Sequence, residues 1–134
     1  MIDIENEIFT KIATALREKY DGIFVTGEYV QSPSSFPCVS IIESDNAVYR
    51  NGISSTETEN YATLMYEVNI YSNKKVGKKS ECKSIAKTLD TIMASLNFTR
   101  MLLNPIQNFE DATIYRICGR YRAIVSKENV IYRR

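Results

Sequence analysis

The chain has 134 residues, with 17 Lys and Arg against 16 Asp and Glu, for a formal net charge of +1. A chain of this length is expected to form one domain, residues 1–134, that buries a core without disulfide or metal support. It contains no histidine, which removes the commonest general base and the commonest metal ligand. Since no catalytic spacing compensates for this, we expect a protein that is not an enzyme and that uses no cofactor or metal.

Hydropathy and cysteine usage indicate an intracellular protein that does not associate with a membrane. No run of about 18 apolar residues is present, and the acidic start MIDIENEIFTK does not fit a signal peptide. We therefore expect no membrane as a partner. Cys38, Cys82 and Cys118 are odd in number and far apart, so we expect reduced, mostly buried thiols of an intracellular protein.

The charge is unevenly distributed along the chain. Residues 1–72 hold four Lys and Arg against eleven Asp and Glu, a net charge of −7, whereas residues 73–134 hold thirteen against five, a net charge of +8. The two halves either neutralise each other within one fold or meet between neighbouring subunits in head-to-tail contacts.

The first predicted elements are a helix and two short strands. Apolar residues at helical spacing predict a helix over 3–19, with Asp3 as its N-cap. Short strands are predicted over 23–30 and 38–43, separated by the turn-rich QSPSSFP. The acidic cluster ESDN, Glu43–Asn46, is read as a turn.

The middle of the chain contains the clearest strand pattern. The polar segment 44–60, with Asn51-Gly52 as a turn signal, is expected to be a loop or a protruding β-hairpin arm. The strand over 61–72 alternates strictly, and its predicted apolar face is Ala62, Leu64, Tyr66, Val68 and Ile70.

The last third predicts one helix and two strands. The helix is expected over 80–96, and the next strand is expected to end around Pro105, before a turn at Glu110-Asp111. A long strand over 112–126 has two faces, one of which carries Arg116, Arg120 and Arg122. The order α-β-β-β-α-β-β predicts an α+β domain: a mixed, largely antiparallel sheet of four to five strands with both helices on one face.

The lysine-rich segment between the strand and the second helix has the context of a phosphate-binding loop. A Walker A loop needs G-x-x-x-x-G-K-[ST], but Ser72 stands at the first glycine and Lys79 at the Ser/Thr position. Nucleotide binding is therefore not predicted. Lys74, Lys75, Lys78 and Lys79 are either a solvated helix start or a surface facing DNA phosphates or an acidic neighbouring subunit.

The three arginines of the last long strand also have two possible roles, one structural and one in contacts with another subunit. Arginines spaced by two or four along one strand face need either solvent or acidic partners, so Arg116, Arg120 and Arg122 form salt bridges on that face or line a basic subunit interface.

Four stretches carry a resemblance to a known family. They are GIFVTGEYVQSPSSFPCVSIIESDN (22–46), YEVNIYSNKKVGKKSE (66–81), LNFTRMLLNPIQNFEDATIYRI (96–117) and VIYRR (130–134). Together they cover most of the chain, and they resemble the small tail-terminator, or tail-completion, proteins of tailed bacteriophages, in particular those of Gram-positive prophages. Proteins of this kind are often labelled minor capsid or head–tail joining proteins.

The resemblance implies a structural protein of the virion neck, made in the cytoplasm of the bacterial host. Subunits would form a ring, expected to be a hexamer, that caps the head-proximal end of the tail tube, ends tube polymerisation and joins the tail to the head connector or stopper. DNA would pass through its lumen without sequence-specific binding. The expected intersubunit arm is Tyr49, Arg50, Asn51, Gly52 and Ile53, and the expected partner-contacting tail is Ile131, Tyr132, Arg133 and Arg134.

Two other functions remain open. The chain fits a head-completion or stopper ring of the same neck, and a DNA-binding accessory factor would account for the lysines through salt-dependent phosphate contacts.

Overall fold

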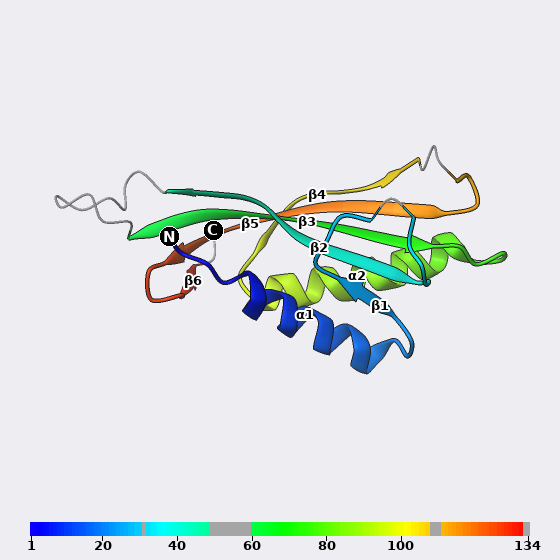
Figure 1. Cartoon of the computed structure of the whole chain (residues 1–134), viewed down its shortest axis with the longest axis horizontal. Helices are drawn as coiled ribbons and strands as arrows, with labels where there is room; N and C mark the ends of the chain where they lie inside the picture. The colour runs from blue at the N-terminus through cyan, green and yellow to red at the C-terminus, as the bar shows by residue number, and fades with distance from the viewer. Residues whose placement is uncertain (31, 49–59, 108–110, 133–134) are drawn as a thin grey trace.

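A six-stranded β-sheet covered on one face by two helices forms the body of the protein (Figure 1). The computed structural model describes residues 1–30, 32–48, 60–107 and 111–132. The chain order is α1 (Glu5–Lys19), β1 (Phe24–Thr26), β2 (Cys38–Val48), β3 (Tyr61–Ser72), α2 (Lys78–Ser95), β4 (Thr99–Ile106), β5 (Tyr115–Ser126) and β6 (Ile131–Tyr132). The predicted α+β class, with both helices on one face, is confirmed.

The sheet is mixed, as predicted. Its strand order is β1-β2-β3-β5-β4, and β6 pairs with β5 outside this path. Among the described strands, only the β1–β2 pair is parallel, and the other pairs are antiparallel. Because β3 and β4 both run antiparallel to β5, they are parallel to each other, and α2 connects them as a crossover. The prediction of four to five strands missed β6, whose two residues are too short to show a period.

The first half of the chain departs from the prediction in two places. The strand predicted over 23–30 ends at Thr26, because the chain then turns over the helix-free face, where the Tyr71 hydroxyl donates a hydrogen bond to the Val30 carbonyl over 3.2 Å. In contrast, β2 continues to Val48 instead of ending at Glu43. A bulge beside Ser44 keeps β2 in register with β3 up to the Val48–Ala62 pair. The acidic cluster 43–46 therefore lies in a strand, and the predicted turn is wrong.

The second half follows the prediction more closely. The limits of β3 are those predicted, and β4 ends one residue beyond Pro105. The last long strand starts at Tyr115 instead of residue 112, because Asp111 accepts hydrogen bonds from the Thr113 backbone N–H and hydroxyl in a turn. Helix α2 starts at Lys78, two residues earlier than predicted, after Gly77 in the left-handed conformation (φ 87°).

The core lies between the two helices and the apolar face of β2, β3 and β5. Helix α1 buries Ile8, Ile12 and Leu16, and α2 buries Ile85, Leu89 and Met93. The strands contribute fully buried residues at alternate positions, as the period of two predicts: Leu64, Tyr66, Val68, Ile70, Tyr121, Ala123 and Val125. Burial of each large apolar side chain contributes roughly 1.5–3 kcal/mol.

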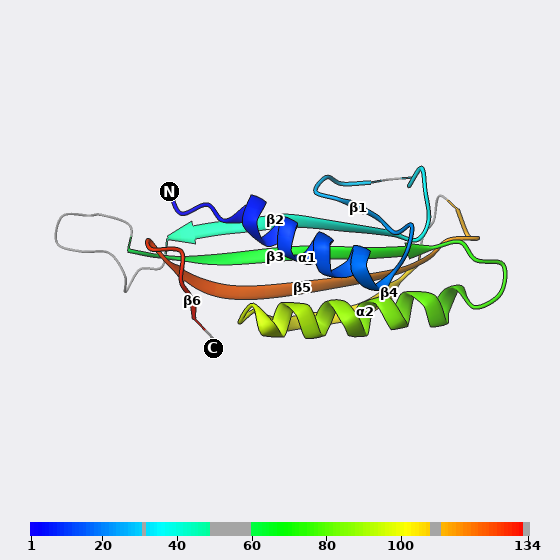
Figure 2. The same cartoon turned by 90° about the horizontal axis from the view of Figure 1, so that it is seen from below.

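The two helices divide the domain into two sides (Figure 2). Helix α1 lies against the β2 side of the sheet, and its first turn is bonded there, since the Glu43 backbone N–H donates to Glu5 Oε2 over 3.1 Å. Helix α2 runs along the other side, against β3, β5 and β4. The N-terminal and C-terminal halves of the chain therefore occupy opposite flanks of one sheet.

Gly119 is required where β5 passes between β3 and β4. A Cβ atom at this position would lie 2.8 Å from Leu103 Cδ1 and 3.1 Å from Val68 Cγ2, so both neighbours would have to move. We predict that Gly119→Ala lowers the free energy of unfolding by about 1–3 kcal/mol, measured by urea denaturation, through overpacking.

Gly27→Ala is the matched control, because a Cβ atom there meets only ordinary contacts of 3.7 Å or more. Its expected effect is below about 0.5 kcal/mol. Equal effects of the two substitutions would contradict the packing explanation.

Candidate functional site

The polar and charged side chains singled out by the sequence gather in separate places. The lysines lie in the turn before α2 and in its first turn, the arginines lie on the helix-free face of β5, and acidic residues of the N-terminal half lie around α1 and β2.

Part of the lysine segment is held by the protein itself. Glu81, in the first turn of α2, accepts a hydrogen bond from the Ser72 hydroxyl over 2.6 Å. It also forms an ion pair with Lys74 at 3.4 Å. Lys78 donates to the Thr113 carbonyl over 3.2 Å. Within the described residues, Lys75 and Lys79 are exposed and make no ion pair. Sequence reasoning did not single out Glu81, although a carboxylate in the first turn of a lysine-rich helix was a signal for it.

Two of the three arginines have polar partners on β3. Arg120 forms an ion pair with Glu67 Oε1 at 3.2 Å, and Arg116 Nε donates to Asn69 Oδ1 over 2.9 Å. Asn69 in turn donates to Glu67 Oε2 over 3.2 Å. The four side chains form one network, in which buried Glu67 and Asn69 are covered by the longer arginines. Arg122 is half-buried farther along the same face.

The register of β3 and β5 creates this network. It sets Glu67 directly opposite Arg120 and Asn69 directly opposite Cys118, next to Arg116. Buried polar groups are expensive unless bonded, so the alternation of β3 required partners for both residues. The salt-bridge alternative for the arginines is therefore the one seen for Arg120.

One lysine and one arginine of the predicted set come together. Lys78 and Arg116 line the same cleft of about 300 Å³, whose apolar wall includes Ile106 and Ile114. The other predicted lysines and arginines that the structure describes do not line this cleft.

The expected arm and tail are only partly described. Tyr49, Arg50, Asn51, Gly52 and Ile53 lie outside the described residues, as do Arg133 and Arg134. Ile131 and Tyr132 form β6, which pairs with Ile124 and Val125 of β5. Ile131 packs against the protein's own core, whereas Tyr132 is 45% exposed and its ring lies 6.0 Å from that of Tyr61.

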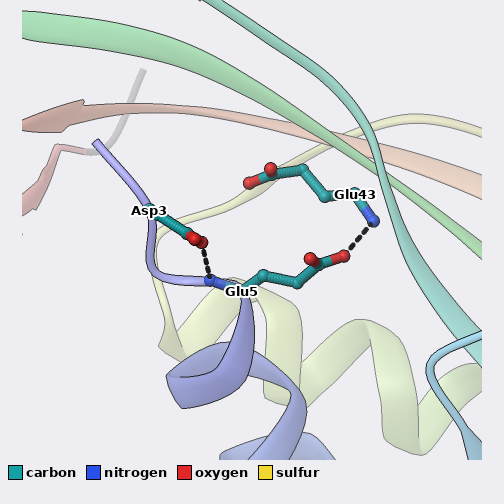
Figure 3. A group of neighbouring side chains, drawn as sticks. All are labelled: Asp3, Glu5 and Glu43. Carbon is teal, nitrogen blue, oxygen red and sulfur yellow. Dashed lines mark hydrogen bonds between the residues drawn. The ribbon is translucent and has the colours of Figure 1, made fainter. Parts of the chain in front are cut away.

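Three carboxylates meet between the start of α1 and β2 (Figure 3). Oxygen atoms of Asp3, Glu5 and Glu43 lie within 4.8 Å of one another. Hard cations take such oxygens, but each carboxylate already accepts a hydrogen bond from the protein. Asp3 accepts from the Glu5 backbone N–H, Glu5 from the Glu43 backbone N–H, and Glu43 from the Tyr66 hydroxyl. Asp3 therefore bonds the start of α1, but the prediction that it is the N-cap is wrong, because the N-cap is Ile4.

The cluster is electrostatically strained. Burial raises the pKa of Glu43, and the neighbouring Glu5 carboxylate raises it further. Burial and the Glu43 charge also raise the pKa of Tyr66. Sequence reasoning missed the cluster, since Glu43 is far from Asp3 and Glu5 along the chain and only the docking of α1 joins them.

The cysteines are buried, as predicted. None of the three forms a disulfide. Burial raises the pKa of Cys38 to about 11 and that of Cys82 to about 12, which leaves both as unreactive thiols at neutral pH.

The acidic N-terminal half and the basic C-terminal half of the sequence form different sides of the domain. We call residues 1–48, which form α1, β1 and β2, the acidic flank; they carry eight Asp and Glu against three Lys and Arg. We call 73–107 and 111–132, which form α2, β4, β5 and β6, the basic flank; they carry eleven Lys and Arg against four Asp and Glu. The strands of the two flanks lie on opposite sides of β3, whereas α1 and α2 lie on the same face and contact each other through Lys19 and Tyr20 (Figure 2).

Comparison of the chain with models of protein families and with curated proteins found no match. Among the described residues, no helix combines the length and the apolar character that crossing a membrane requires.

The Glu67 network yields a stability prediction. Glu67→Ala removes the acceptor of Arg120 and of Asn69, so we expect the free energy of unfolding to fall by about 2 kcal/mol in urea denaturation. Glu18→Ala, which removes an exposed carboxylate of α1, is the control and is expected to change it by less than about 0.5 kcal/mol. Equal losses would mean that the network contributes nothing specific.

Glu43 yields a pH prediction. Its pKa is raised in the folded state, so the folded protein binds this proton more tightly than the unfolded chain, and stability is lost as the pH rises through the folded pKa. Glu43→Gln removes that loss and keeps an oxygen for the Tyr66 hydroxyl. We expect a higher melting temperature than wild type at pH 7, and a difference that shrinks as the pH falls toward about 4.

Thermal denaturation across pH measures this difference, with Glu18→Gln as the exposed control. A Glu43→Gln protein less stable than wild type at neutral pH would show that the carboxylate is stabilising as a charge.

Proposed function

We propose that this protein is a structural component of a bacteriophage neck, or of a phage-tail-like particle, that assembles into a ring. The ring caps the head-proximal end of the tail tube, ends tube polymerisation and joins the tail to the head connector. The observation that carries the proposal is the separation of charge onto two opposite flanks of one domain, −5 on the acidic flank and +7 on the basic flank, from the counts of eight against three and eleven against four. The resemblance of four stretches of the chain to tail terminators supports the identity of the assembly.

Opposite charge on opposite flanks favours one kind of assembly. A two-fold contact through either flank alone would set acid against acid or base against base. A head-to-tail contact sets the acidic flank of one copy against the basic flank of the next. Such a contact is heterologous, so it repeats from copy to copy and closes into a ring when the rotation permits.

The remaining surfaces supply contacts for partners. The ends of the ring would meet the tail-tube protein and the head connector or stopper. Lys75 and Lys79, exposed and without an ion-pair partner among the described residues, would lie near DNA. Phosphate attraction of this kind does not depend on sequence, which suits DNA in transit.

The proposal predicts a defined defect in virion assembly. Deletion of the gene should give overlong tails or tails without heads in electron micrographs, because nothing would end tube growth. Purified protein added to the deletion lysate should bind one end of free tubes and restore infectious particles.

Two outcomes would redirect the assignment. If the purified protein binds the isolated portal but not free tubes, it is a head-completion or stopper ring. If the deletion strain produces normal virions, the protein has no function in the neck. A DNA-binding accessory factor would instead bind DNA with an affinity that falls steeply with salt, and Lys74, Lys75, Lys78 and Lys79 changed together to Ala would abolish that binding.

A further inference from the structure

A groove on the basic flank lies between α2 and the edge strand β4. Its volume is about 440 Å³. Lys83 and Lys87 of α2 line one side and Arg100 of β4 lines the other, while the apolar residues Leu103 and Ile117 form part of its lining. Basic groups thus surround an apolar strip at the open edge of the sheet.

Packing at β4 leaves this groove open. β4 has a neighbour only in β5, so its other side is unpaired among the described strands. Leu103 packs down on Gly119, which has no side chain, and therefore sits low beside α2. Met101, Leu102 and Ile106 of the same strand are exposed, at 50%, 36% and 39%. An apolar edge strand of this kind is a surface for contact with another chain.

The charge of the groove is not balanced by its own residues. Arg100 forms an ion pair with Asp90 at 3.2 Å, and Asp90 also accepts a hydrogen bond from the Tyr121 hydroxyl over 2.8 Å. Lys83 and Lys87 are exposed and make no ion pair among the described residues. The groove therefore has two lysines available for carboxylates brought by another molecule.

We propose that this groove binds the acidic flank of a second copy of this chain, as the contact that builds the ring; the inference rests on the proposed function. Within one molecule, α1 already contacts α2 through hydrogen bonds of Lys19 and Tyr20 with Thr88, and β3 and β5 separate the strands of the acidic flank from the groove. The same flank of another copy can reach it. Its exposed carboxylates are Asp3, Glu7, Glu18, Asp21, Glu28 and Asp45.

The contact is strengthened by relief of repulsion on the acidic side. Asp3, Glu5 and Glu43 crowd within 4.8 Å, and this crowding helps to raise the pKa of Glu43. A lysine from the neighbouring copy near the acidic flank would reduce that repulsion, while apolar residues of β4 would be covered. Charge selects the partner and its orientation, and burial of the apolar strip adds affinity.

The test uses two variants, each blocked on one flank. The first variant, Lys83→Glu with Lys87→Glu, reverses the charge of the groove. The second, Glu7→Lys with Glu28→Lys and Asp45→Lys, reverses the charge of the acidic flank. We expect wild type to form oligomers and each variant alone to be a monomer, with self-association weakened by at least roughly 10-fold, in light scattering and analytical ultracentrifugation. An equimolar mixture should associate again, because the intact acidic flank of one variant meets the intact groove of the other, and the two reversed surfaces are also opposite in charge.

Lys75→Glu with Lys79→Glu is the matched control, since it makes the same charge change outside the groove; it should assemble like wild type. Wild-type assembly should also weaken with added salt. The inference would be overturned if the groove-reversed protein assembles normally, if the mixture of the two variants stays monomeric, or if wild type stays monomeric. Capping of tail tubes by wild-type protein is scored separately, so the proposed function can survive failure of this contact.

Discussion

The pairing of β3 with β5 is the constraint on which the rest of the structure depends. The two strands stay in register over twelve residue pairs, from Tyr61–Ser126 to Ser72–Tyr115. This register sends the apolar residues of both strands toward α1 and α2, and it sends Glu67 and Asn69 toward Arg120 and Arg116 on the other face. A slip of one residue would bury the arginines and expose the core, so the helices and the polar network fix the same alignment.

The separation of charge follows from topology. The N-terminal elements α1, β1 and β2 add to one side of β3, and the C-terminal elements α2, β4 and β5 add to the other. A difference in composition along the chain therefore becomes a difference between two surfaces. The same sequence folded with β5 beside β2 would have brought the opposite charges together, and the reason for a head-to-tail assembly would disappear.

The sequence predicted what depends on local period and missed what depends on docking. The limits of β3, the two helices on one face and the buried cysteines follow from alternation and apolar spacing. The extension of β2 to Val48 was missed, because its polar residues are held by pairing with β3 and not by their own propensity. The carboxylate cluster of Glu43 was missed for the same reason, since residues so distant in sequence meet only when α1 docks.

The lysine segment shows why exposure and pairing must be judged together. As a run of letters, Lys74, Lys75, Lys78 and Lys79 form one basic patch. In the fold, Glu81 and the Thr113 carbonyl bond Lys74 and Lys78, so half of the patch stabilises the start of α2. Lys83 and Lys87, one and two turns farther along the helix, border an apolar groove at a sheet edge. Cations beside apolar surface gain more from a partner than cations in open solvent, which moves the expected contact from the turn to the groove.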